Sequence, residues 1–170
     1  SNNHWNNVGG GICITSSSQL KNSSISENSS TGDGGGVYVS QSGSVYNCKI
    51  SNNRANNYGG GMYLFAYNST VTASNCLIDN NTCGYSNGSC ICMYYYNSSV
   101  QVINSTIVRN TGSGIYSSNG TAYLKNCLVW GNESSLSGSV NCTYSAIEGG
   151  HTGEGNISLD DVCNLPMFVY

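Results

Sequence analysis

The stretch NCLIDNN, residues 75–81, has turn-forming asparagines at its ends and apolar residues at its centre, and its pattern occurs five times in this chain. The other copies are NSSISEN (22–28), NCKISNN (47–53), NSTIVRN (104–110) and NCLVWGN (126–132). Successive copies begin 25, 28, 29 and 22 residues apart. Self-similarity with a period of about 20 to 50 residues is typical of a solenoid, in which each repeat packs on its neighbours.

A glycine-rich motif recurs in phase with this pattern. Its copies are GGGICI at Gly9, GGGVYV at Gly34, GGGMYL at Gly59, GSCICM at Gly88 and GSGIYS at Gly112. Apolar residues alternate after each copy, and no stretch has the 3.6-residue period of an amphipathic helix. The sequence therefore predicts an all-β fold, a parallel β-helix of about six coils with 22–29 residues per coil. The glycines are predicted to form tight corners, through positive φ or close approach of neighbouring backbones.

Stacking the repeats in register predicts which residues point inward. Two apolar columns result, Leu20/Val45/Ala73/Val102/Leu124 and Ile25/Ile50/Ile78/Ile107/Val129. Between them lies a predicted inward asparagine ladder of Asn22, Asn47, Asn75, Asn104 and Asn126. Stacked strands lie about 4.8 Å apart, so each amide could donate to the next and satisfy it inside the core. The second asparagine of each motif is predicted to follow the strand, in the left-handed conformation that Asn tolerates.

The same alternation predicts an outward column after each glycine motif. Its members are Cys13, Tyr38, Tyr63, Cys92 and Tyr116, of which Tyr38, Tyr63 and Tyr116 form a predicted outer aromatic ladder. Two interpretations remain open. The rings could stack between coils and stabilise the sheet surface, or they could form a binding face.

Composition narrows the class of protein. The 170 residues suit a single domain, 1–170, with 133–170 as the closing coil and C-terminal capping segment. Five Lys plus Arg residues cannot provide the basic stripe that nucleic acid requires, so no nucleic-acid partner is predicted. No apolar run approaches the roughly 18 residues of a transmembrane helix, so no membrane insertion is predicted. The opening SNNHWNNVGGG aligns with SNNRANNYGGG from Ser51, and we therefore expect the first coil to lack a capping element.

On these motifs the chain resembles the right-handed parallel β-helix repeat family, which includes the pectate-lyase-like proteins. Its GGGMY and IDNN segments are similar to the GGAI and FxxN repeats of chlamydial polymorphic outer membrane proteins. The resemblance covers nearly the whole chain and implies a right-handed solenoid. It implies no single activity, because the fold carries lyases, hydrolases, adhesins and passive stalks.

The chemistry of those enzymes is hard to assemble from this sequence. Pectate lyases share a calcium site of clustered acids with an Arg base, but Asp79 takes a coil position held elsewhere by Ser, Val and Trp. Asp79 and Arg109 are predicted to form a surface ion pair between coils. EGGHTGEG, residues 148–155, combines His with acids and is predicted to be a turn, with acid–base work or metal binding as alternatives. We predict no catalytic residues, no metal site and no cofactor.

The nine cysteines favour an oxidising setting, so an extracellular or cell-surface location is predicted. Cys83 with Cys90, and Cys142 with Cys163, are possible disulfides, whereas Cys48, Cys76 and Cys127 share one inward column as small apolar side chains. Eleven Asn-x-Ser/Thr sequons occur. Those at Asn68, Asn97 and Asn119 lie in predicted turns and are the candidates for glycosylation.

Two functions fit these observations. The first is an extracellular structural or adhesive module, a stalk segment or filament subunit whose partner is another copy stacked end to end or further coils of the same protein. The second is a carbohydrate-binding or polysaccharide-degrading β-helix, because tyrosine-rich faces can stack on sugar rings. The sparse and scattered carboxylates favour the first and argue against an enzyme.

Overall fold

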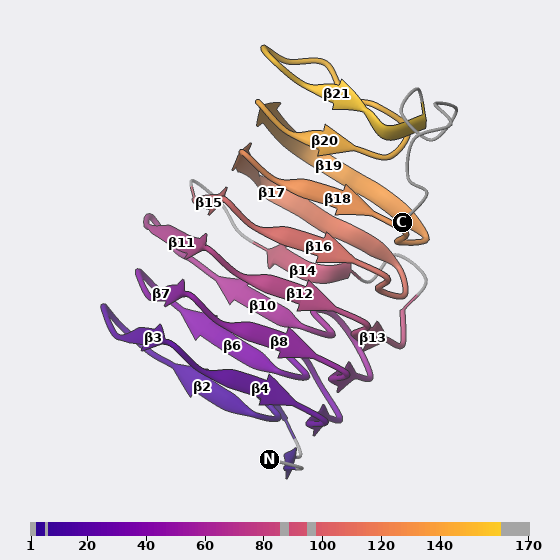
Figure 1. Cartoon of the computed structure of the whole chain (residues 1–170). Helices are drawn as coiled ribbons and strands as arrows, with labels where there is room; N and C mark the ends of the chain where they lie inside the picture. The colour runs from indigo at the N-terminus through magenta and orange to yellow at the C-terminus, as the bar shows by residue number, and fades with distance from the viewer. Residues whose placement is uncertain (1–2, 6, 86–88, 95–97, 161–170) are drawn as a thin grey trace.

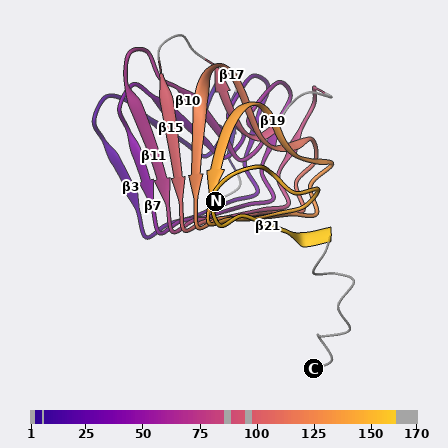
Figure 2. The same ribbon diagram turned by 90° about the horizontal axis from the view of Figure 1, so that it is seen from above.

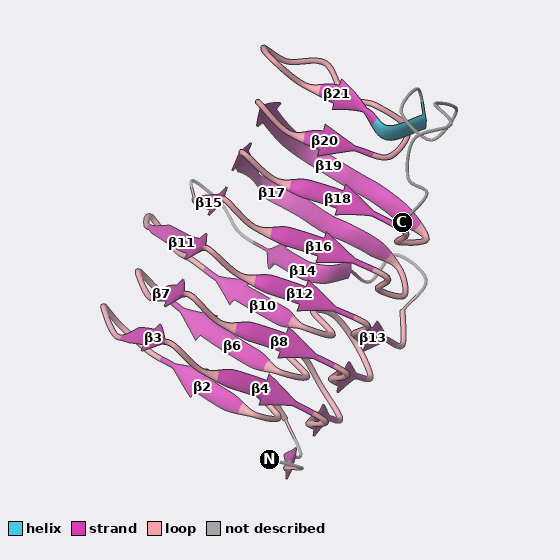
Figure 3. Cartoon of the chain, viewed as in Figure 1, coloured by secondary structure: helices cyan, strands magenta, loops and turns pink. Residues whose placement is uncertain are grey.

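The computed structural model describes residues 3–5, 7–85, 89–94 and 98–160. Short strands succeed one another along the whole of this length, and every pairing between them is parallel (Figure 3). The strands of successive coils lie one above the other, so the chain winds upward from its N-terminal coil as a solenoid (Figure 1). The predicted all-β parallel β-helix is therefore confirmed.

Three long faces run along the solenoid. The first face comprises β2 (Ile12–Ile14), β6 (Val37–Ser40), β10 (Met62–Phe65), β14 (Ser89–Tyr94) and the N-terminal halves of β17 (Ser113–Lys125) and β19 (Ser134–Thr143). The second face comprises β3 (Gln19–Lys21), β7 (Ser44–Tyr46), β11 (Thr70–Ser74), β15 (Ser99–Ile103) and the C-terminal halves of β17 and β19. Viewed from above, the second-face strands lie side by side (Figure 2).

The third face is a seven-stranded sheet. In spatial order it comprises β4 (Ser24–Ser26), β8 (Lys49–Ser51), β12 (Leu77–Asp79), β16 (Thr106–Val108), β18 (Leu128–Trp130), β20 (Ala146–Ile147) and β21 (Ile157–Ser158). A short fourth sheet of β1 (His4–Trp5), β5 (Ser29–Ser30), β9 (Arg54–Ala55) and β13 (Thr82–Cys83) precedes the glycine corners. Each coil thus passes through the three long faces in turn.

The core lies between these faces and follows the predicted columns. Ile25, Ile50, Ile78, Ile107 and Val129 are register partners on the third face, and all are buried. Leu20, Val45, Ala73, Val102 and Leu124 form the matching column on the second face. Each buried aliphatic side chain contributes about 1.5 to 3 kcal/mol, so these columns, together with the buried first-face residues, supply the apolar driving force.

The asparagine ladder predicted from Asn22, Asn47, Asn75, Asn104 and Asn126 is wrong in its direction. All five side chains are exposed, and their φ angles of 49° to 54° place them in the left-handed region. They form the bend between the second and third faces, where Asn is favoured because it tolerates positive φ. Two exposed pairs still bond: Asn47 Nδ2 donates to Asn22 Oδ1 over 2.7 Å, and Asn126 Nδ2 donates to Asn104 Oδ1 over 3.1 Å.

The buried ladder is formed by the second asparagine of each motif. Its members are Asn28, Asn53, Asn81 and Asn110, which are at most 3% exposed, and the half-buried Asn132. Asn53 shows the pattern: its backbone N and its Nδ2 both donate to Asn81 Oδ1 over 3.0 Å. The left-handed residue at this corner is the one before each ladder member. The roles of the two asparagines are therefore the reverse of those predicted.

The glycine triplets show both predicted properties, positive φ and close approach of neighbouring backbones, at different positions. The first glycines, Gly9, Gly34 and Gly59, have φ of 67° to 69°. At the second glycines, Gly10, Gly35 and Gly60, an added Cβ would lie 2.4 to 2.5 Å from backbone atoms of other residues. The third glycines, Gly11, Gly36 and Gly61, leave room for the ladder amides, which an added Cβ would approach to 2.8 to 3.1 Å. The triplet therefore forms the corner and also admits the buried ladder.

Candidate functional site

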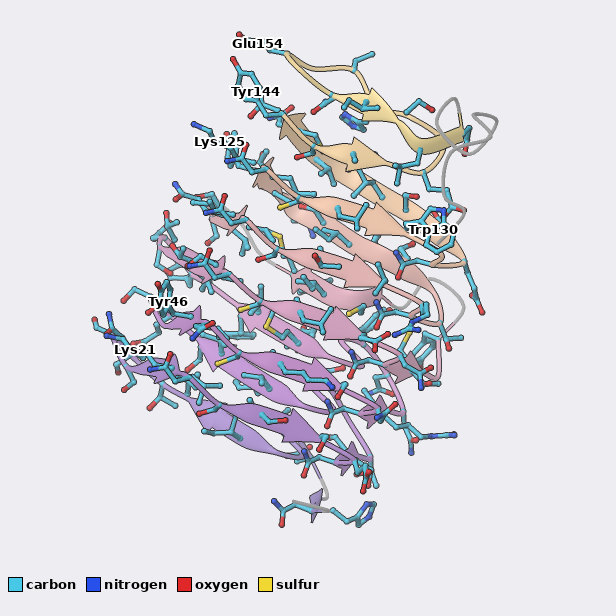
Figure 4. All side chains as sticks on the ribbon, in the orientation of Figure 1. Lys21, Tyr46, Lys125, Trp130, Tyr144 and Glu154 are labelled. Carbon is cyan, nitrogen blue, oxygen red and sulfur yellow. The ribbon has the colours of Figure 1, made fainter. Side chains whose placement is uncertain are left out.

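The EGGHTGEG segment forms a turn whose polar groups are bonded locally. Glu148 Oε2 accepts from the backbone N of Gly131 over 2.7 Å, and the Tyr144 hydroxyl donates to Glu154 Oε1. Tyr144 and Glu154 project together from the C-terminal end of the stack (Figure 4). Within the described residues, no three His, Cys, Asp or Glu side chains are grouped to hold a metal ion. This geometry agrees with the predicted turn.

Asp79 and Arg109 form the predicted ion pair between neighbouring coils. Arg109 Nε donates to Asp79 Oδ1 over 2.8 Å, and Nη2 donates to Asp79 Oδ2 over 2.7 Å. The hydrogen bonds and charge of Asp79 raise the pKa of Arg109. The Arg109 side chain is 67% exposed, so this pair belongs to the outer surface of the third face.

The outer aromatic column is packed rather than open. Tyr38 and Tyr63 are register partners on the first face, and their rings are stacked with centroids 5.7 Å apart. Tyr63 is only 6% exposed, Tyr38 and Tyr116 are half-buried, and Cys92 separates Tyr63 from Tyr116 along the column. Burial raises the pKa of the Tyr38 hydroxyl. The geometry favours stacking between coils over a binding face.

The eight cysteines that the structure describes form no disulfide, so the predicted Cys83–Cys90 disulfide is not formed. The two side chains are held by different neighbours. Cys83 Sγ donates to the carbonyl of Thr111 over 3.3 Å, whereas Cys90 Sγ, fully buried on the first face, accepts from Asn81 Nδ2 over 3.9 Å. Cys142 is also a free, buried thiol. Its predicted partner, Cys163, lies outside the described residues.

The inward cysteine column lies at the start of the third face. Cys48, Cys76 and Cys127 are each 3% exposed, and each Sγ donates to the backbone carbonyl two residues earlier over 3.2 to 3.4 Å. Ser105 and Ser145 make the same bond with their hydroxyls. Burial raises the pKa of the Cys76 thiol to about 11. The column therefore suits small side chains with one weak donor.

Thiol labelling provides a test of this arrangement. A thiol with a pKa of about 11 is only about 0.1% thiolate at pH 8, and the thiolate is the reactive form. Partial burial also raises the pKa of the Cys13 thiol, but Cys13 is exposed. In a Cys163→Ser background, we therefore expect Ellman's reagent to label Cys13 in a first, faster phase at pH 8 and the buried thiols only after unfolding. The fast phase should vanish in a Cys13→Ser variant. An intact mass two hydrogens low under non-reducing conditions would contradict the free-thiol assignment.

Two of the predicted glycosylation sites lie close to one another in space. Asn68 and Asn119 are both exposed, have φ of 48° and 60°, and line the same hollow. Asn97 lies outside the described residues. Glycosylation of these sites stays a prediction.

That hollow, at the edge between the first and second faces, has a volume of about 640 Å³. Besides Asn68 and Asn119 it is lined by serine and threonine hydroxyls and by Tyr123. A second hollow of about 310 Å³ borders the other side of Tyr123. Tyr123 was not among the predicted site residues, although the alternation of Thr121, Tyr123 and Lys125 with buried residues marks all three as outward.

A third hollow lies at the N-terminal end of the solenoid. It has a volume of about 630 Å³ and is lined by His4, Val8, Ile12, Cys13 and the first glycine triplet. The N-terminal strand of every sheet is paired on one side only among the described residues. This end therefore presents unpaired strand edges beside apolar side chains.

Comparison with known proteins agrees with this geometry. A family model described as a right handed beta helix region matches residues 1–154. The chain belongs to the right-handed β-helix family. No curated protein and no solved structure matches it. Membership of the right-handed β-helix family establishes the fold and leaves the activity open. No helix within the described residues is long and apolar enough to cross a membrane.

Proposed function

We propose that this β-helix is a structural or adhesive module of an extracellular or cell-surface protein, and that it associates end to end with coils of its own kind. The observation that carries the proposal is the repeated register of the described coils, whose corresponding strands pair in parallel along each long face. Because each coil presents the same strands as its neighbour, a further coil can pair in the same register.

The side chains at the N-terminal edge also favour a further coil of the same kind as the partner. Ile12 is half-buried and lines the 630 Å³ hollow, whereas its counterparts in the next two coils, Val37 and Met62, are 0% exposed. A further coil in register would bury Ile12 as these residues are buried. Solenoid repeats gain much of their stability from such interfaces with a neighbouring repeat.

The neutral surface supports a passive role. The chain has five basic and eight acidic residues, and among the described ones no three His, Cys, Asp or Glu side chains are grouped to hold a metal ion. On the first face, Tyr38 and Tyr63 stack between coils. The polysaccharide-degrading alternative would require converging acids.

Electron microscopy and light scattering of the purified chain test the proposal. We expect rods or filaments that lengthen with protein concentration, with coils spaced about 4.8 Å apart along the axis. An Ile12→Lys variant should prevent this growth, because a charge on an edge strand blocks further pairing. Tyr67→Lys is the matched control, because Tyr67 is 66% exposed and away from the first coil, and it should assemble normally. Monomers of fixed length at every concentration would overturn self-association.

A further inference from the structure

Among the described residues, Tyr123 is the side chain that borders both the 640 Å³ and the 310 Å³ hollow. It lies in β17 and is 48% exposed. The 640 Å³ hollow lies on one side of it and the 310 Å³ hollow on the other. An exposed aromatic ring between two hollows offers an apolar surface with free space beside it.

The residues next to Tyr123 in the stack carry amides. Gln101 precedes it in register on β15, and Asn141 follows it on β19. Both are exposed, and both line the 310 Å³ hollow. Neighbouring strands lie about 4.8 Å apart, so an amide flanks the ring on each side along the solenoid axis. Each amide can donate and accept hydrogen bonds at once.

The 640 Å³ hollow adds further neutral polar groups. Asn119 and Thr121 reach it from the same strand as Tyr123. Ser69 also lines it, and Ser69 Oγ is buried without a hydrogen-bond partner among the described residues. A buried hydroxyl is usually hydrogen-bonded to protein or water, so Ser69 Oγ is a group that a ligand hydroxyl in this hollow could bond.

Charge determines which class of ligand fits. Lys125, bordering the 310 Å³ hollow, is the one ionic side chain among the described residues that line either hollow. Lys125 projects from the same side of the stack as Lys21 and Tyr46 (Figure 4), members of the outward column next to that of Tyr123. Polyanions need several cations, which this surface does not provide. A ligand with many neutral hydroxyls and a flat apolar side fits the ring and the amides best.

We propose that the two hollows form one binding site for a neutral oligosaccharide. A sugar ring lies against Tyr123, and its hydroxyls bond to Gln101, Asn141 and Asn119. The assembly proposed above uses the ends of the solenoid, whereas this site uses its side. Each of the two proposals can therefore be tested independently of the other.

Calorimetric titration of the chain tests the site. The protein is made in bacteria and its mass checked, because Asn119 and Asn141 lie in sequons and an attached glycan would fill the hollows. The probes are cellohexaose, xylohexaose, mannohexaose and chitohexaose, with tetragalacturonate as the acidic probe. We expect at least one neutral hexasaccharide to bind, and Tyr123→Ala to weaken that binding about tenfold or more.

The matched control is Tyr67→Ala, which removes a tyrosine that is 66% exposed and lies outside both hollows, and it should leave the affinity unchanged. Circular dichroism of each variant confirms the fold. No binding of any neutral probe at millimolar concentration would overturn the proposal. So would binding of tetragalacturonate alone, or neutral binding that persists in Tyr123→Ala.

Discussion

Replacing Asn81 with alanine is expected to lower the free energy of unfolding by about 3 to 5 kcal/mol. Asn81 is fully buried, and its Oδ1 accepts from both the N and the Nδ2 of Asn53 over 3.0 Å. Its own Nδ2 donates to Ile50 O over 3.0 Å and to Asn110 Oδ1 over 3.1 Å. Alanine leaves two donors of Asn53 without their acceptor inside the core, and each costs about 1 to 3 kcal/mol. Denaturant unfolding followed by circular dichroism measures the loss.

Asn75→Gly is the matched control, because Asn75 belongs to the same motif but is exposed with a φ of 53°. Glycine adopts this conformation freely, so the change in unfolding free energy should stay within about 0.5 kcal/mol. The comparison separates the two asparagines of the motif. If Asn75→Gly lowered the free energy of unfolding more than Asn81→Ala, the first asparagine of the motif would be the buried one, which would contradict the structure.

Gly60→Ala is expected to destabilise the chain by about 4 kcal/mol or to prevent folding altogether. An added Cβ would lie 2.5 Å from the carbonyl oxygen of Thr82, 2.7 Å from its carbonyl carbon and 2.9 Å from its nitrogen. All three are backbone atoms of the neighbouring coil, so no side-chain rotation relieves the clash. The soluble yield and the urea midpoint of the purified variant measure the effect.

Gly131→Asn is the control for this substitution. Gly131 has a φ of 66°, and an added Cβ there meets no atom closer than 3.7 Å. In earlier coils, Asn52 and Asn80 occupy the equivalent corner position with the same sign of φ. We therefore expect Gly131→Asn to leave the urea midpoint nearly unchanged. A tolerated Gly60→Ala would show that the coils are not in the close contact described.

The apolar part of the fold was predictable because it lies in straight strands. Between two bends the side chains alternate strictly, so the spacing of Ile50, Ile78 and Ile107 indicates their common column. The in-phase glycine motifs then set the register of whole coils. The same alternation placed Tyr38 and Tyr63 in one column, which the structure confirms.

The asparagines were misplaced because a left-handed residue interrupts that alternation. Asn75 and Asn80 both have positive φ, so counting inward and outward positions through either of them gives the wrong side. The Cys83–Cys90 disulfide failed for a related reason. The two cysteines are close in sequence, but closeness in sequence does not show which neighbours each side chain contacts. Cys90 occupies the position that a glycine holds in the coil below, and its Sγ lies beside Asn81. The hollows at Tyr123 depend on side-chain sizes in several coils, which no single repeat reveals.

The buried asparagine ladder also has a direction. From Asn28 to Asn110, each amide nitrogen donates to the amide oxygen of the next ladder member, so each amide oxygen from Asn53 to Asn132 accepts from the coil before it. The amide nitrogens of Asn53, Asn81, Asn110 and Asn132 also donate to a backbone carbonyl of the previous coil. The ladder of amide hydrogen bonds therefore gives the solenoid a direction along its axis. Continuing the ladder requires the tail of one stack to meet the head of the next, because like ends would set oxygen against oxygen or NH₂ against NH₂. Any growth through these ends is one-way, and its interface is heterologous and open-ended instead of closing into a symmetric pair.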